Sequence, residues 1–115
     1  MTMYYEYTGE YRVPEVIQKS LDEGKIGKLG LLRLRFLQAN EPMYYSNLLM
    51  KGELERHLME IEAKARVETE LLVQKLLKTN PPPSNRASEE TLRQHMHSLR
   101  VMAEEVVKKE LIFKQ

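Results

Sequence analysis

Basic side chains gather in one glycine-containing stretch near the N-terminus. The cluster comprises Lys19, Lys25, Lys28, Arg33 and Arg35, opposed by Asp22 and Glu23, which leaves a local excess of +3. Lysine and arginine bind phosphate groups, and neighbouring glycines let the backbone approach such a group closely. We therefore take Lys25, Lys28, Arg33 and Arg35 as candidate residues for binding nucleic acid or a protein partner. The alternative is that Arg33 and Arg35 form the solvated face of a core helix.

A pair of tyrosines beside an asparagine forms a second group of candidate residues. Tyrosine offers a rigid ring and a hydroxyl, and it is enriched where proteins bind one another. Tyr45, Leu48 and Leu49 fit an inward-facing helical stripe, so we predict that Tyr45 packs in the core. Tyr44 and Asn47 are left as candidate partner-binding residues.

Residue types that catalyse reactions or bind metals do not combine into a recognisable site. His95 and His97 are two residues apart, which points them in opposite directions on a helix, and His57 with Glu60 supplies only two ligands. The chain has no cysteine, its serines lack the setting of a nucleophile, and no phosphate-binding loop is present. We expect no enzyme activity, no catalytic residues, no metal site and no cofactor.

Length and composition predict one globular domain. The chain has 115 residues, of which 42% are hydrophobic and 30% are charged, and its formal net charge is +1. The hydrophobic content excludes a wholly disordered chain. The small net charge excludes an electrostatic field over the whole molecule that would attract DNA or an anionic membrane. No apolar run approaches the roughly 20 residues that span a bilayer. We expect a cytoplasmic bacterial protein that does not bind membranes.

Two stripes of apolar residues at helical spacing are the clearest structural signal. The first comprises Leu54, Leu58, Ile61, Ala65, Leu72 and Leu76, and the second comprises Leu92, Met96, Leu99, Ala103 and Val106. Prolines at 81–83 separate them, and Ser88 is suited to cap the second helix. The pattern predicts a long antiparallel helical hairpin over residues 53–113, with a Pro-rich turn at 80–87.

The segments before this hairpin are shorter. Aromatic runs around Gly9 predict an N-terminal β-hairpin or ribbon over residues 1–14. Short helices are expected within residues 28–51, with Asn40 as the N-cap of the second and Gly52 at its C-terminal end. The predicted fold is mainly α: an N-terminal β-hairpin, short helices and a long antiparallel helical hairpin, all within one domain over residues 1–115.

A helix-turn-helix that inserts the helix after Gly52 into DNA is disfavoured by charge. From Glu53 to Glu70 there are six glutamates against three basic residues, so this helix carries −3 and would be repelled by phosphates.

Over nearly its full length, the chain resembles the transposon-encoded TnpV family of small proteins from bacterial mobile elements. The matching residues are Tyr11, Val13, Pro14, Ile26, Gly27, Lys28, Gly30, Leu32, Arg33, Leu34, Arg35, Phe36, Leu37, Tyr45, Asn47, Leu48, Leu49, Gly52, Leu54, Leu58, Met96, Ser98, Leu99, Arg100, Ala103, Glu104, Glu105, Val106, Glu110, Leu111 and Ile112. The chain departs from the family pattern at Leu92, where a Trp is usual, and at His97, where an Asn is usual.

The resemblance implies an accessory role beside a recombinase on a mobile element. We expect a non-enzymatic protein that binds another protein, either the element's recombinase or a host defence nuclease such as Cas9, which would be an anti-CRISPR type of inhibition. The alternative is an excisionase-like regulator that binds DNA through the stretch from Lys25 to Arg35. A third possibility is a homodimer in which two hairpins form a four-helix bundle.

Overall fold

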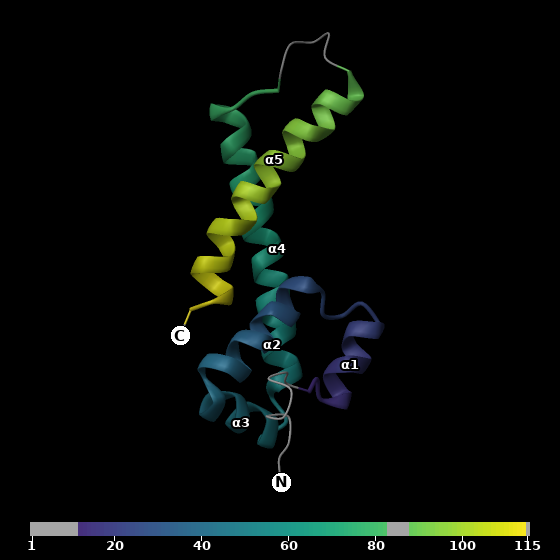
Figure 1. The fold of residues 1–115 in the computed structure, drawn as a ribbon, viewed down its shortest axis with the longest axis vertical. Helices are drawn as coiled ribbons and strands as arrows, with labels where there is room; N and C mark the ends of the chain where they lie inside the picture. Colours follow the sequence, from purple (N-terminus) through teal and green to yellow (C-terminus); the bar gives the residue numbers. More distant parts are fainter. Residues whose placement is uncertain (1–11, 83–87, 115) are drawn as a thin grey trace. The chain divides into compact units, whose positions relative to one another are not determined.

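The structure is a computed structural model that describes residues 12–82 and 88–114 (Figure 1). The described part of the chain is helical and contains no strand. Its elements are α1 (Glu15–Asp22), α2 (Lys28–Asn40), α3 (Pro42–Met50), α4 (Leu54–Thr79), α5 (Glu89–Val107) and a π-helix, η2 (Lys108–Ile112). The β-hairpin was predicted over residues 1–14, of which residues 1–11 lie outside the described part of the chain and residues 12–14 form no strand. The mainly α prediction is confirmed for the rest.

The described chain divides into two compact units, and α4 takes part in both. Unit 1 contains residues 12–62, with α1, α2, α3 and the start of α4. Unit 2 contains residues 63–114, with the remainder of α4, α5 and η2.

Unit 1 has a core of branched aliphatic side chains that come from all four of its helical segments. The buried residues of this core are Ile17, Ile26, Leu34, Leu37, Leu48, Leu54 and Leu58, and Tyr45 packs against them, as predicted from its spacing. Burying such a side chain completely contributes about 1.5–3 kcal/mol, so these contacts are the main reason why three short helices hold their places.

The boundaries of the short helices follow from proline and glycine. Pro42 occupies the first turn of α3, so the N-cap is Glu41 and the expectation that Asn40 caps this helix is wrong. Asn40 instead ends α2, and its side-chain amide donates to the carbonyl oxygen of Phe36 at 3.3 Å. Gly52 has a φ of 72°, a conformation that favours glycine, and it ends the turn after α3 as predicted.

Unit 2 is an antiparallel helical pair, which confirms this part of the predicted hairpin (Figure 1). Arg100 forms an ion pair with Glu70, and the His95 ring lies 2.7 Å from the carbonyl oxygen of Asn80. These contacts join later residues of α5 to earlier residues of α4, as antiparallel helices require. Ser88 caps α5 as predicted, because its Oγ accepts a hydrogen bond from the Thr91 amide at 3.1 Å.

The apolar stripe of α5 is rotated slightly from the predicted one. Leu99 and Ala103 are buried as expected, but Leu92 and Val106 are exposed, and Val107 takes the buried position. The last turn is a π-helix, in which the Phe113 amide bonds to the Lys108 carbonyl at 2.8 Å.

Close contact between α2 and α4 depends on Gly30. A Cβ atom at this position would lie 2.5 Å from Cγ2 of Ile26 and 3.2 Å from Oε1 of Glu62. Ile26 is itself fully buried, so its methyl group cannot turn out into solvent. The absence of a side chain at residue 30 therefore sets how closely the two helices approach.

We expect Gly30→Ala to destabilise the protein. The overpacking cost of about 1–3 kcal/mol exceeds the gain in helix propensity of about 1 kcal/mol. Urea unfolding followed by circular dichroism measures the change. The control is Ala39→Gly, an exposed position on the same helix, where loss of propensity alone costs about 1 kcal/mol. A Gly30→Ala protein more stable than wild type would contradict the close approach.

Candidate functional site

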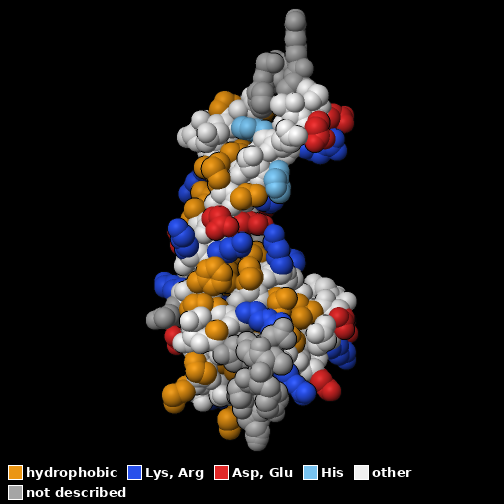
Figure 2. Space-filling model, in the orientation of Figure 1, with side chains coloured by type: hydrophobic (Ala, Val, Ile, Leu, Met, Phe, Trp, Pro, Cys, Tyr) orange, Lys and Arg blue, Asp and Glu red, His pale blue; other side chains and the backbone are white. Residues whose placement is uncertain are grey.

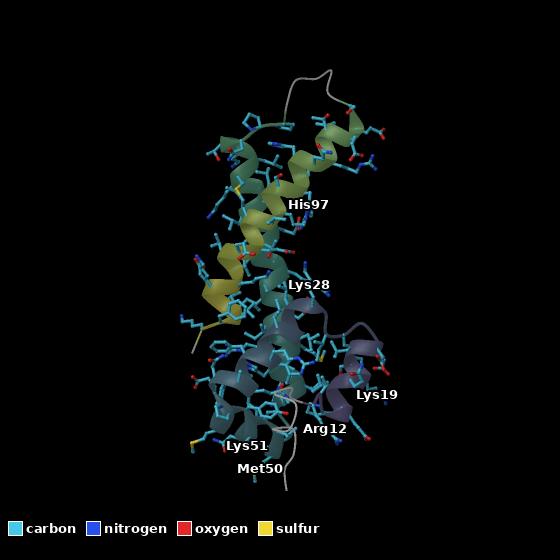
Figure 3. All side chains as sticks on the ribbon, in the orientation of Figure 1. Arg12, Lys19, Lys28, Met50, Lys51 and His97 are labelled. Atoms are coloured by element: carbon cyan, nitrogen blue, oxygen red, sulfur yellow. The ribbon has the colours of Figure 1, made fainter. Side chains whose placement is uncertain are left out.

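The basic candidates of the sequence do not form one surface group, because one of them points into the protein. Lys25 lies in the turn before α2 and forms an exposed ion pair with Glu23 at 3.2 Å. Lys28 and Arg35 are exposed on α2, and each takes part in a further interaction within the chain. Arg33 is only 7% exposed. Figure 3 shows Lys28 at the start of α2, whereas Lys19 extends from α1.

Arg33 makes specific contacts on the inner side of α2. Its Nε donates to Nε2 of His57 at 3.2 Å, and its guanidinium carbon lies 5.6 Å from the centre of the Phe36 ring. Burial lowers the pKa of Arg33, and the nearby Tyr44 and Glu41 partly oppose this shift. An arginine remains charged under such conditions, so this cation is held by an imidazole and a ring face. The expectation that Arg33 is a solvated residue is wrong, whereas Arg35 is exposed.

His57 is the acceptor in this contact and must be neutral to fill that role. The hydrogen bond from Arg33 needs a lone pair on Nε2, so the ring carries its proton on Nδ1. Burial lowers the pKa of His57, the Arg33 cation lowers it further, and Glu60 acts in the opposite direction. The Tyr44 ring packs edge-on against the imidazole, with 5.8 Å between centroids. Tyr44, predicted to bind a partner, thus joins α3 to α4 by one side of its ring.

The amino terminus of α2 is closed by a carboxylate from α4. Oε1 of Glu62 accepts hydrogen bonds from the backbone amides of Gly27 at 2.9 Å and Gly30 at 2.7 Å. Free amides and the helix dipole make such a terminus an anion site, and α2 has no acidic residue in its first turn. The glycine amides that the sequence offered to a phosphate therefore already bind a carboxylate of the protein. Glu62 is 4% exposed.

Glu62 was missed by sequence reasoning, which counted it only as one acidic residue among six. A usable signal was present, because residue 62 lies four after Leu58 and three before Ala65 and so interrupts the apolar stripe of α4. An acidic residue on a buried stripe needs a partner, and glycine amides upstream were available. Nothing comparable in the sequence pointed to the pairing of Arg33 with His57.

Asn47, the other candidate on α3, is exposed between two exposed methionines. Met43 and Met50 retain 81% and 85% of their surface, and Leu49 is also exposed. Hydrophobic side chains accordingly protrude from the surface over α3 (Figure 2). Tyr45 faces the other way, and its hydroxyl oxygen lies 3.2 Å from Nε2 of Gln38.

Unit 2 exposes further apolar side chains on both helices. Val67 and Leu71 lie four residues apart on α4, and Met102 and Val106 lie four residues apart on α5. Each pair therefore forms a short strip along one face of its helix.

Across residues 12–82 and 88–114, no group of three or more His, Asp or Glu side chains is placed to hold a metal ion. Within the same ranges, no helix is long and apolar enough to cross a membrane.

We expect Glu62→Gln to lower the free energy of unfolding by roughly 1–3 kcal/mol, because the terminus of α2 loses a charged acceptor that is buried with it. Denaturant unfolding provides the measurement. Glu60→Gln changes an exposed glutamate two residues earlier and should stay within about 0.5 kcal/mol of wild type. Equal effects of the two substitutions would show that the bonds to Gly27 and Gly30 contribute little.

The lowered pKa of His57 predicts a dependence of stability on pH. The unfolded chain, with a His pKa near 6.5, takes up this proton more readily than the folded protein does. The free energy of unfolding should therefore be highest above pH ~7 and fall as the pH is lowered through ~6.5. His57→Gln keeps an acceptor for Arg33 and should make the free energy of unfolding depend less steeply on pH. His97→Gln, at an exposed position of α5, should leave this pH dependence as it is in wild type. If the stability of His57→Gln depended on pH as steeply as that of wild type, His57 would not be the cause of the pH dependence.

Comparison with known proteins agrees with the resemblance seen in the sequence. The family model described as transposon-encoded protein TnpV matches residues 4–112, which covers both units. Searches of curated proteins and of solved structures find no match. The matched range includes Gly30, Arg33, His57 and Glu62, and with nearly the whole chain covered, the protein belongs to the transposon-encoded TnpV family.

Proposed function

We propose that this TnpV-family protein is a non-enzymatic accessory factor that acts by binding another protein. The partner is a nucleic-acid enzyme, either the recombinase of the mobile element or a host defence nuclease such as Cas9. The observation that carries the proposal is the apolar surface of unit 2, where Val67 and Leu71 on α4 and Met102 and Val106 on α5 are exposed. Exposed strips of large apolar side chains on a small protein are typical of protein interfaces.

The strips of unit 2 consist of apolar side chains, which suit a protein partner better than the charged backbone of a nucleic acid. Each exposes two large aliphatic side chains, and a partner would gain free energy by removing them from water. An ion pair between Arg100 and Glu70 connects the two helices of this unit, so each strip lies on a helix that is already held in place. A preformed surface lowers the entropy cost of binding.

The alternative is an excisionase-like regulator that binds DNA through unit 1. The exposed Lys25, Lys28 and Arg35 favour it, since three cations on one short stretch can contact phosphates. Against it, Lys25 is paired with Glu23, and Glu62 occupies the amides at the start of α2. The net charge available to DNA in this region is therefore smaller than the sequence suggests.

The test is a binding assay with the purified recombinase of the same mobile element and, separately, a purified Cas9. We expect one of them to bind the wild-type protein after nuclease treatment, with affinity that changes little between about 50 and 200 mM salt. Val67→Lys combined with Leu71→Lys should weaken binding by about tenfold or more. His97→Lys, which adds a charge at an exposed position of α5 outside both strips, serves as the matched control.

The same assay distinguishes the DNA-binding alternative. Lys28→Glu combined with Arg35→Glu changes two exposed cations and spares the buried Arg33. If binding disappears with nuclease treatment, falls steeply with salt and is lost in this variant, the protein is a DNA-binding regulator and the proposal is wrong.

A further inference from the structure

Helix α3 exposes more apolar surface than its place in unit 1 requires. Among its nine residues, Pro42 to Met50, all but Ser46 and Asn47 are apolar or aromatic, yet only Leu48 is buried. Met43 and Met50 are more than 80% exposed, and methionine is a side chain that adapts readily to a facing surface. The helix is fixed from behind by Leu48 and Tyr45, so its outer side is presented on a rigid support.

The exposed residues form one face with a symmetric pattern. Met43, Asn47 and Met50 are four and three residues apart, which places them in one row along the helix. Asn47 lies near the middle of that row, with one methionine toward each end. Read in the opposite direction, the row has the same order of side-chain types.

Such a row is complementary to itself when two copies run antiparallel. Met43 of one copy then lies against Met50 of the second copy, and the reverse contact occurs on the other side of a two-fold axis. The two Asn47 amides meet near that axis, and each amide has both a donor and an acceptor to offer the other. No charged residue interrupts the face, because residues 42–50 are all uncharged.

Charges at the two ends of α3 favour the same arrangement. Glu41 immediately precedes the helix and Lys51 immediately follows it, as Figure 3 shows for Met50 and Lys51 at its end. Antiparallel pairing brings Glu41 of each copy to the end that carries Lys51 of the other, whereas parallel pairing would place like charges together. The helix dipoles also oppose each other in the antiparallel arrangement.

We propose that α3 is a self-association surface that pairs antiparallel with α3 of a second copy of this protein through Met43, Asn47 and Met50. The paired segment is about 14 Å long at ~1.5 Å per residue, which makes a small interface and a reversible dimer. This dimer differs from a four-helix bundle of two hairpins, since it involves unit 1 alone. It also does not depend on the apolar strips of unit 2.

Sedimentation equilibrium of the full chain tests the proposal. The wild-type mass should rise from 13.6 kDa toward twice that value as concentration increases between about 10 µM and 1 mM. Met43→Lys with Met50→Lys places like charges opposite each other and should hold the protein at the mass of one chain. Met43→Lys with Met50→Glu places opposite charges together in both contacts and should restore the dimer, now weakened by salt.

Both double variants change highly exposed residues, and circular dichroism should show the same helix content and melting as wild type. In a methyl spectrum, the signals of Met43 and Met50 should shift with concentration while that of Met102 stays fixed. A wild-type protein that remains monomeric at 1 mM would overturn the proposal. So would equal masses for the two double variants, or a dimer abolished by Val67→Lys with Leu71→Lys and kept by Met43→Lys with Met50→Lys.

Discussion

The buried carboxylate of Glu62 at the start of α2 is the interaction on which unit 1 depends. Its Oε1 accepts hydrogen bonds from two backbone amides that have no carbonyl partner within α2, and so it fixes the end of one helix against the side of another. This contact is possible because Gly30 has no side chain between the helices. One turn further along α2, the same alignment places Arg33 opposite His57. A buried arginine that donates to His57 and a helix terminus are thus positioned by one contact.

Much of the helical architecture could be predicted because it is encoded locally. The apolar stripe and the prolines at 81–83 predicted α4 to within one residue at each end, and Ser88 predicted the start of α5. The prediction failed for Asn40 because a proline in the first turn selects the residue before it as the cap. The β-ribbon predicted over residues 1–14 does not extend to residues 12–14, which form no strand, and for residues 1–11 it stays a prediction.

The candidate site was harder to predict because it depends on which faces of the helices meet. Arg33 and Arg35 look alike in the sequence, yet residue 33 lies on the side of α2 that faces α4 while residue 35 lies on the other. His57 was considered only as a metal ligand, since its role as an acceptor exists only once Arg33 is placed beside it. By contrast, Tyr45 was correctly predicted to pack in the core, because its spacing to Leu48 is a local property.

The π-helix at the end of α5 has a geometric consequence for the residues that follow it. In a regular α-helix, five residues turn the chain by about 500°, so Val107 and Ile112 would point about 140° apart. Bonding from residue 108 to residue 113 widens this turn and brings the two closer to the same direction, and both are in fact buried. The wider turn has the effect of one extra residue in the helix, so it resets the phase of the side chains without a break in the backbone. Sequence periodicity alone carries no record of such a reset, so the stripe of α5 could not be extended to Ile112 from its spacing to Val107.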